Sequence, residues 1–169
     1  VQGDKVGLYD DKGKELTEDL ELKYNSEMLP DGDLITFETS EGKGWINFDG
    51  KVVIDPISGL YGKNVFNGSG RLPIKCDEGN LLIDRKGKIV KELDFEPTEI
   101  HFKDSYIGKL NRSTFAVFDY DGKQLSEEFW IDSEHNFKGL NPLAQWAYSY
   151  HWSTFLSYFS WEMRKRKHD

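Results

Sequence analysis

The sequence predicts a mainly β protein: an array of four antiparallel β-hairpin repeats, solenoid or propeller-like, followed by one C-terminal α-helix. Three observations support this prediction. A Gly-Lys pair recurs at near-constant spacing, apolar residues stand at fixed positions around each pair, and the pattern stops after residue 138. We therefore divide the chain into a repeat domain over residues 1–138 and an aromatic-rich helix with a basic end over residues 139–169.

Four Gly-Lys pairs mark the repeat. Their glycines are 37, 37 and 35 residues apart and lie at Gly13, Gly50, Gly87 and Gly122. The stretches around them align without gaps and read GLYDDKGKEL from Gly7, GWINFDGKVV from Gly44, LLIDRKGKIV from Leu81 and AVFDYDGKQL from Ala116. Self-similarity at a fixed period is typical of repeat architectures, in which each unit is one supersecondary element.

The aligned positions predict one tight hairpin per unit. Asp or Asn stands three residues before every glycine, at Asp10, Asn47, Asp84 and Asp119. This choice is typical of a type I turn, because the side-chain oxygen accepts a backbone N–H and the glycine takes a left-handed conformation. Two apolar residues precede each turn, as in a strand buried on both faces. The returning strands start at Leu16, Val52-Val53, Ile89-Val90 and Leu125.

A further apolar run precedes each of the later hairpins and predicts a third strand per unit. The runs are Leu34–Phe37, Leu72–Ile74 and Tyr106–Ile107. Pro73 predicts an exposed edge in its copy, because proline cannot donate a hydrogen bond to a neighbouring strand. Units of this length cannot bury a core alone, so they must stack on one another. An open array, a solenoid and a small propeller-like ring all satisfy the pattern.

The repeat resembles the bacterial WG repeat, also called the KWG repeat. The second copy, from Lys43 to Pro56, matches best, with Gly44-Trp45-Ile46-Asn47 followed by the Gly-Lys pair. The first copy keeps the leading Gly7 but lacks the tryptophan, and the last two rest on the Asp-x-x-Gly-Lys turn alone. The resemblance spans residues 5–125. It implies a β-rich repeat with an interaction-related role, and it supplies no catalytic residues.

The C-terminal segment departs from the repeat. Asn141-Pro142 predicts a helix start, and from Leu143 to Lys167 no glycine or proline interrupts. At helical spacing its rings form two stripes, which supply our candidate partner-binding residues: Trp146, Tyr150, Trp152, Phe155, Tyr158, Phe159 and Trp161. One stripe can cap the β array, as terminal elements of repeat proteins must. The alternatives for the rings are another protein chain, or a membrane surface beside the basic run 164–167.

Patterns for chemistry are scarce, so we expect no enzyme, no cofactor and no metal site. Cys76 has the acidic neighbours Asp77 and Glu78, which disfavour a thiolate. The four histidines show no zinc spacing. Residues 119–122 resemble the start of a calcium loop, but the hairpin turn explains them. As the sole cysteine, Cys76 favours a cytoplasmic location without excluding export.

Charge limits the range of partners. The chain has a net charge of −8, and residues 1–138 hold 28 of its 30 acidic and 18 of its 22 basic residues. An acidic body repels phosphate backbones, so we expect no nucleic acid, and a charged protein partner would be basic. We predict a non-catalytic protein-interaction or scaffolding module whose helix docks on the repeat or on a partner. The alternative is an acidic inhibitor or immunity-type protein that masks a basic toxin or effector.

Overall fold

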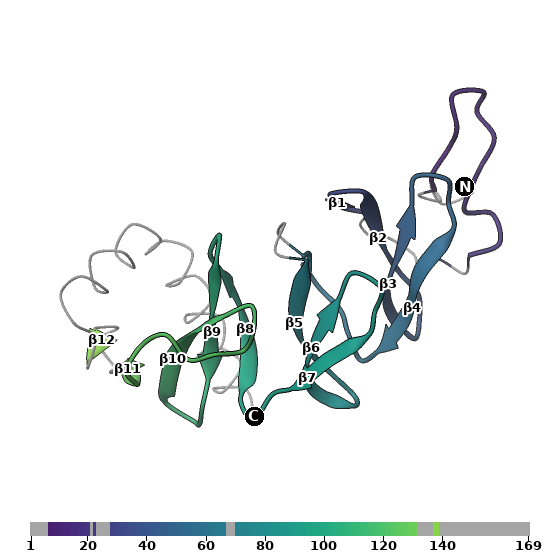
Figure 1. Ribbon diagram of the computed structural model, residues 1–169. Helices are drawn as coiled ribbons and strands as arrows, with labels where there is room; N and C mark the ends of the chain where they lie inside the picture. The colour runs from purple at the N-terminus through teal and green to yellow at the C-terminus, as the bar shows by residue number, and fades with distance from the viewer. Residues whose placement is uncertain (1–6, 21, 23–27, 67–69, 132–136, 139–169) are drawn as a thin grey trace.

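The computed structural model describes residues 7–20, 22, 28–66, 70–131 and 137–138. These residues are mainly β, as predicted, and no helix occurs among them. Three antiparallel sheets follow one another along the chain and do not close into a barrel (Figure 1). The helix predicted over residues 139–169 lies outside the described residues. Within the described ranges, no helix is long and apolar enough to cross a membrane.

Each sheet is a meander in which the strands pair in chain order. The first sheet contains β1 (Pro30–Asp31), β2 (Leu34–Glu38), β3 (Gly42–Asn47) and β4 (Val52–Ser58). The second contains β5 (Arg71–Cys76), β6 (Gly79–Asp84) and β7 (Ile89–Glu92). The third contains β8 (Glu96–His101), β9 (Ser105–Lys109), β10 (Thr114–Asp119), β11 (Phe129–Ile131) and β12 (Phe137–Lys138). Strands β2, β5 and β9 cover the three apolar runs that the sequence assigned to third strands.

The four Gly-Lys turns share one hydrogen-bonded geometry. In the first turn, the Gly13 N–H donates to the Asp10 carbonyl at 3.1 Å, and Asp10 Oδ1 accepts the N–H groups of Lys12 and Lys14 at 2.9 and 2.8 Å. The same three bonds recur in the other turns at 2.8–3.1 Å. All four glycines have φ between 72° and 79°. Because this conformation is costly for any residue with a Cβ, the glycine determines where each hairpin turns.

The strands that lead into the second and third turns, β3 and β6, are buried on both faces. In β3, Trp45 packs toward the second sheet, and Ile46 packs on the opposite face. In β6, Leu81 and Ile83 pack toward the first sheet, whereas Leu82 packs toward the aromatic rings of the third. Successive side chains of a strand point to opposite faces, so two adjacent apolar residues serve two interfaces. This arrangement lets each sheet stack on the next.

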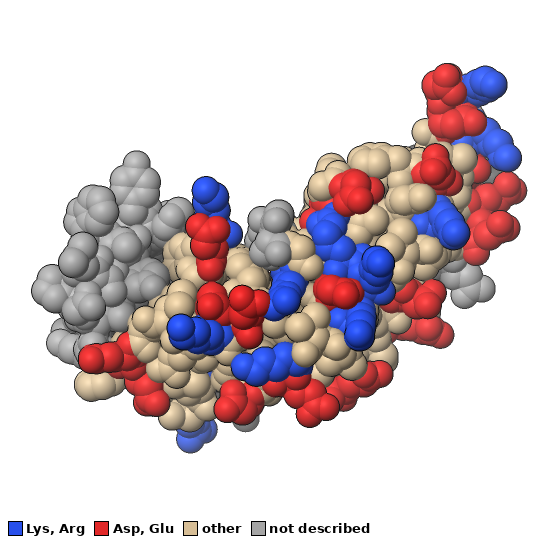
Figure 2. All heavy atoms as spheres, viewed as in Figure 1, with Lys and Arg blue, Asp and Glu red and all other residues tan. Residues whose placement is uncertain are grey.

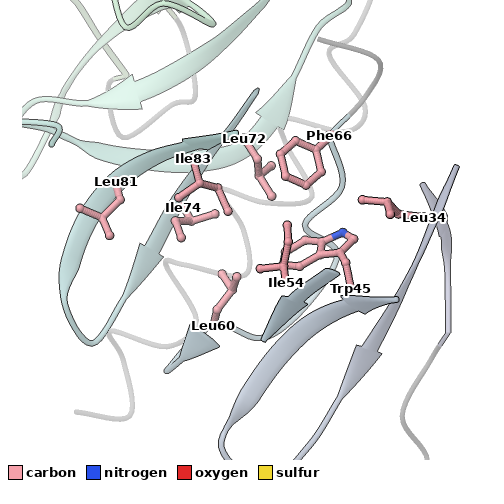
Figure 3. Packing of buried hydrophobic residues seen from close by; sticks show 9 residues of the cluster. All are labelled: Leu34, Trp45, Ile54, Leu60, Phe66, Leu72, Ile74, Leu81 and Ile83. Carbon is pink, nitrogen blue, oxygen red and sulfur yellow. The ribbon is translucent and has the colours of Figure 1, made fainter. Parts of the chain in front are cut away.

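The interface between the first and second sheets holds the largest core cluster (Figure 3). Trp45 is fully buried at its centre, and its indole meets the Phe66 ring edge-on at 5.5 Å between centroids. Burial of one such side chain contributes roughly 1.5–3 kcal/mol relative to exposure. The cluster draws on strands of both sheets and on the connection between them: Leu34, Trp45, Ile54, Leu60, Phe66, Leu72, Ile74, Leu81 and Ile83.

A buried carboxylate fixes the same interface. Asp31, whose side chain is 3% exposed, accepts the Trp45 indole N–H at 2.9 Å and the Phe66 backbone N–H at 3.0 Å. Arg85, from the third turn, lies 3.7 Å from the Asp31 carboxylate and also forms an ion pair with the exposed Asp33. The Arg85 guanidinium stands 5.2 Å from the centroid of the Phe66 ring. The charge of Asp31 is therefore both paired and hydrogen-bonded, as burial of a carboxylate requires.

Proline marks the edges of the sheets. Pro30, Pro56, Pro73 and Pro97 lie in β1, β4, β5 and β8, and each of these strands is the edge of its sheet. The predicted edge position of Pro73 is confirmed, but its predicted exposure is wrong, because Pro73 is buried. Residues 59–64 and β8 lie beside it and line the same pocket. An edge strand with proline offers an incomplete set of N–H groups to another strand.

Candidate binding pocket

A pocket of about 400 Å³ opens between the connection over residues 59–64 and the edge strands β5 and β8. This volume is in the range of small-ligand sites. Its lining joins parts of the chain that are far apart in sequence: Gly59, Leu60, Tyr61, Gly62, Asn64, Pro73, Lys75, Glu96, Pro97, Thr98 and Glu99. The connection forms one wall, β5 the next, and the start of the third sheet closes the other side.

Close packing fixes the connection over residues 59–64 at its first residue, Gly59. Gly59 has φ of 75°, and a Cβ built on it would lie 2.2 Å from Asp77 Oδ1, so only glycine is accommodated there. Asp77 in turn accepts the Ser58 hydroxyl at 2.7 Å and donates its backbone N–H to the Ser58 carbonyl at 3.0 Å. The connection is thereby tied to the β5–β6 turn of the second sheet.

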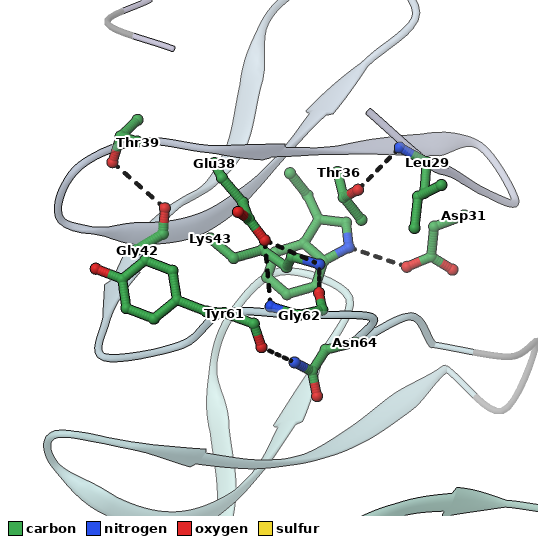
Figure 4. Close-up of polar contacts among 11 residues, drawn as sticks. Leu29, Asp31, Thr36, Glu38, Thr39, Gly42, Lys43, Tyr61, Gly62 and Asn64 are labelled. Carbon is green, nitrogen blue, oxygen red and sulfur yellow. Dashed lines mark hydrogen bonds and ion pairs between the residues drawn. The ribbon is translucent and has the colours of Figure 1, made fainter. Parts of the chain in front are cut away.

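A buried lysine anchors the other end of this wall (Figure 4). Lys43 is 1% exposed, and its ammonium donates to the Gly62 carbonyl and lies 3.7 Å from Glu38 Oε1. The same Glu38 oxygen accepts the Gly62 N–H at 3.2 Å. Because both backbone groups of Gly62 are bound by this ion pair, the wall is fixed to the first sheet. The Tyr61 hydroxyl adds a bond to the Ser40 carbonyl at 3.0 Å.

The lining of the pocket combines polar and apolar surface in nearly equal parts. Leu60 is 2% exposed, and Pro73 is also buried. The Thr98 hydroxyl donates to the Ile107 carbonyl at 2.7 Å and accepts the Ile100 N–H at 3.3 Å, so its hydrogen-bonding capacity is taken up within the third sheet. Leu60 and Pro73 therefore belong to the apolar part of a mixed lining.

The rim of the pocket is charged. Lys75 and Glu96 form an ion pair at 3.0 Å, with side chains 61% and 34% exposed. Glu99 is exposed, and its Oε1 lies 3.4 Å from where a Cβ of Gly62 would stand. The Tyr61 ring, 42% exposed, lines the same opening. With two carboxylates and one ammonium, the lining carries an excess negative charge.

An aromatic cluster in the third sheet contains His101. Burial lowers the pKa of His101 to about 4, and its Nδ1 lies 3.1 Å from the Tyr120 hydroxyl. Burial also raises the pKa of Tyr106, with smaller contributions from Asp119 and Tyr120. The Tyr106 hydroxyl is buried without a hydrogen-bond partner. A neutral imidazole stacked among such rings belongs to the core of the sheet.

A second set of exposed residues follows three of the turns, on β4, on β7 and beside the isolated bridge at Gln124, and is called here the hairpin ridge. It consists of one lysine and one exposed apolar residue from each of three turns: Lys51 and Val53, Lys88 and Val90, and Lys123 and Leu125. The apolar members are 38%, 42% and 54% exposed. Lys and Arg side chains gather over the β6–β7 turn in the middle of the molecule, among many acidic ones (Figure 2).

The candidate residues chosen from sequence meet different outcomes. Trp146, Tyr150, Trp152, Phe155, Tyr158, Phe159 and Trp161 all lie outside the described residues. Residues 119–122 form the fourth hairpin turn. The Cys76 thiol is partly exposed and lies 3.5 Å from the Gly79 carbonyl. In the part of the chain that the structure covers, no three His, Cys, Asp or Glu side chains are grouped as metal ligands.

Sequence reasoning did not identify the pocket. Its lining comes from three segments, and the local sequence signal for it is the pair Gly59 and Gly62, both with positive φ.

Comparisons of the chain with protein-family models, curated proteins and solved structures found no match. The resemblance to the WG repeat therefore stays a prediction.

Proposed function

We propose that the chain is a non-catalytic protein-interaction module in which four copies of one β-hairpin unit form a stacked scaffold. The shared geometry of the four turns and the two-sided burial of β3 and β6 support a repeated unit. The aromatic C-terminal segment serves as a second contact element, docking on the scaffold or on the partner.

The hairpin ridge is the observation that carries this proposal. Val53, Val90 and Leu125 occupy the same position in successive units, and each remains well exposed. Sheets that pack on both sides have no folding requirement for exposed aliphatic side chains at these positions. A row of apolar residues flanked by lysines suits a protein surface, because the apolar centre supplies affinity and the charges supply orientation.

Affinity purification with the full chain tests the proposal. The bait is the wild-type chain, the ridge variant Val53→Ser/Val90→Ser/Leu125→Ser, or the control Trp130→Ser, which removes a side chain that is 50% exposed on β11. We expect a protein that the wild type and the control retain and the ridge variant loses, and that binds the purified chain directly. Retention of the same proteins by all three baits would count against the ridge.

The salt dependence of that interaction separates the module from an acidic inhibitor. A basic toxin masked by an acidic body is bound mainly by charge, so its affinity falls steeply between low and high salt. Contacts centred on Val53, Val90 and Leu125 are apolar, and their affinity changes little over the same range.

A further inference from the structure

We propose that the pocket between residues 59–64, β5 and β8 binds an alkylammonium or guanidinium group, as carried by a lysine or arginine side chain or by a free amine. The inference rests on the charge of the rim, the apolar part of the lining and the anchored wall. It is independent of the hairpin ridge, which shares no residue with the pocket.

The charge balance of the rim favours a cation. Lys75 is held by Glu96 at 3.0 Å, which leaves Glu99 without a basic partner among the described residues. A ligand ammonium beside Glu99 would complete a second ion pair and bring the lining to neutrality. An anion would meet two carboxylates and only one ammonium, which is already paired.

The backbone of the pocket lining also favours a cationic ligand over an anionic one. The edge strands β5 and β8 contribute Pro73 and Pro97 to the pocket, and neither residue has an N–H. The Gly62 N–H is already bound to Glu38 at 3.2 Å. These three positions offer no donor to an anionic or carbonyl-rich ligand.

The apolar part of the lining suits an aliphatic cation. The stems of lysine and arginine pack on apolar surface while their charged ends remain at the rim. Leu60 and the two prolines belong to the apolar part of the lining, which such a stem would cover. The anchors at Gly59 and Gly62 hold the wall in place before a ligand enters, which lowers the entropic penalty of binding.

Amide chemical shifts of the full chain measure the binding. The cationic probes are n-butylammonium, Nα-acetyl-lysine methylamide and Nα-acetyl-arginine methylamide, and the neutral counterpart is Nα-acetyl-norleucine methylamide. We expect the cationic probes to shift the amides of Leu60, Gly62 and Glu99 in a saturable way and the neutral probe to leave them unchanged. A capped amino acid that binds at least as tightly as n-butylammonium assigns a protein side chain as ligand. Tighter binding of n-butylammonium assigns a free amine.

Two variants change the rim in opposite directions. Glu99→Gln removes the unpaired carboxylate and should weaken binding of the cationic probes about tenfold. Lys75→Met leaves Glu96 unpaired and should tighten binding about threefold, a gain that misfolding cannot mimic. Glu92→Gln, on the exposed strand β7, is the matched control and should bind as the wild type does.

Three results would overturn the assignment. They are equal binding of the norleucine probe, the absence of any saturable shift with the cationic probes, and unchanged affinity in both Glu99→Gln and Lys75→Met. Each of them would leave the ridge proposal intact, because the bait experiment does not involve these residues.

Discussion

The indole N–H of Trp45 donates a 2.9 Å hydrogen bond to Asp31 Oδ2 at a point where both side chains are almost fully buried. The same carboxylate accepts the backbone N–H of Phe66, which lies 35 residues further along the chain. One side chain thus joins β1, β3 and the segment that leads to the second sheet. The stacking of the first two sheets depends on this polar contact as well as on apolar burial.

Removal of the Asp31 carboxylate should lower the stability of the fold substantially. Asp31→Ala leaves two buried N–H groups without an acceptor and Arg85 without its buried partner, so we expect the free energy of unfolding to fall by about 3 kcal/mol. Chemical denaturation, monitored by tryptophan fluorescence, measures this loss. The matched control is Asp33→Ala, which removes the exposed partner of the same Arg85 and should cost much less, because exposed ion pairs contribute little to stability. Equal losses in the two variants would contradict a special role for Asp31.

Two turn glycines should respond differently to alanine. Gly13 and Gly50 have φ of 79° and 77°, so alanine is strained at both. A Cβ on Gly13 meets nothing within 4 Å, whereas one on Gly50 would lie 2.4 Å from the Leu16 carbonyl oxygen. We expect Gly13→Ala to cost about 1 kcal/mol and Gly50→Ala at least about 3 kcal/mol. Thermal and chemical unfolding of the two variants provide the comparison, and similar losses would mean that Leu16 does not pack against Gly50.

The buried ion pair of Lys43 and Glu38 should show strong coupling. Lys43→Met leaves Glu38 without its cation and the Gly62 carbonyl without a donor, so we expect a loss of about 2–3 kcal/mol. In the double variant with Glu38→Gln, the second change should cost much less than it does alone. A double-mutant cycle on the free energy of unfolding should give a coupling of about 1–2 kcal/mol. Additive losses would show that the two side chains act separately.

His101 should make stability depend on pH. Because burial lowers its pKa from 6.5 to about 4, the unfolded chain binds a proton in this interval that the folded chain does not. The contribution of His101 is complete above pH 6.5 and is lost as the pH falls toward 4. We expect the wild type to lose about 2 kcal/mol more than His101→Phe between pH 7 and pH 4. Parallel denaturation curves for the two proteins over this range would exclude the effect.

The proposed role of the C-terminal rings can be tested in the full chain. We expect replacement of Trp146, Tyr150, Tyr158 and Trp161 by serine to abolish self-association or partner binding while the β scaffold stays folded. Light scattering after size exclusion measures the mass, and far-UV circular dichroism reports on the scaffold. Unchanged mass and unchanged partner binding would remove this segment from the proposal.

Much of the β organisation was predictable because it is local. A turn of the Asp-x-x-Gly type is decided by bonds between residues two to four positions apart, and the structure places all four turns at the expected glycines. Strand β8 was not predicted, since Glu96–His101 contains a proline and few apolar residues. Its pairing with β9 comes from the neighbouring strand rather than from its own propensity.

The pocket and the sheet interface beside it could not be predicted, because they depend on contacts between residues that are distant in sequence. Lys43 and Asp31 are charged residues, which are rarely buried, and nothing adjacent in sequence indicates their partners. Their burial becomes favourable only when Glu38 and Trp45 from neighbouring strands, and Gly62 and Phe66 from the segment between β4 and β5, converge on them. The sequence by itself determined where the chain turns and which residues are apolar. Only the tertiary structure decided which faces meet, because the contacts between the sheets depend on how whole sheets stack.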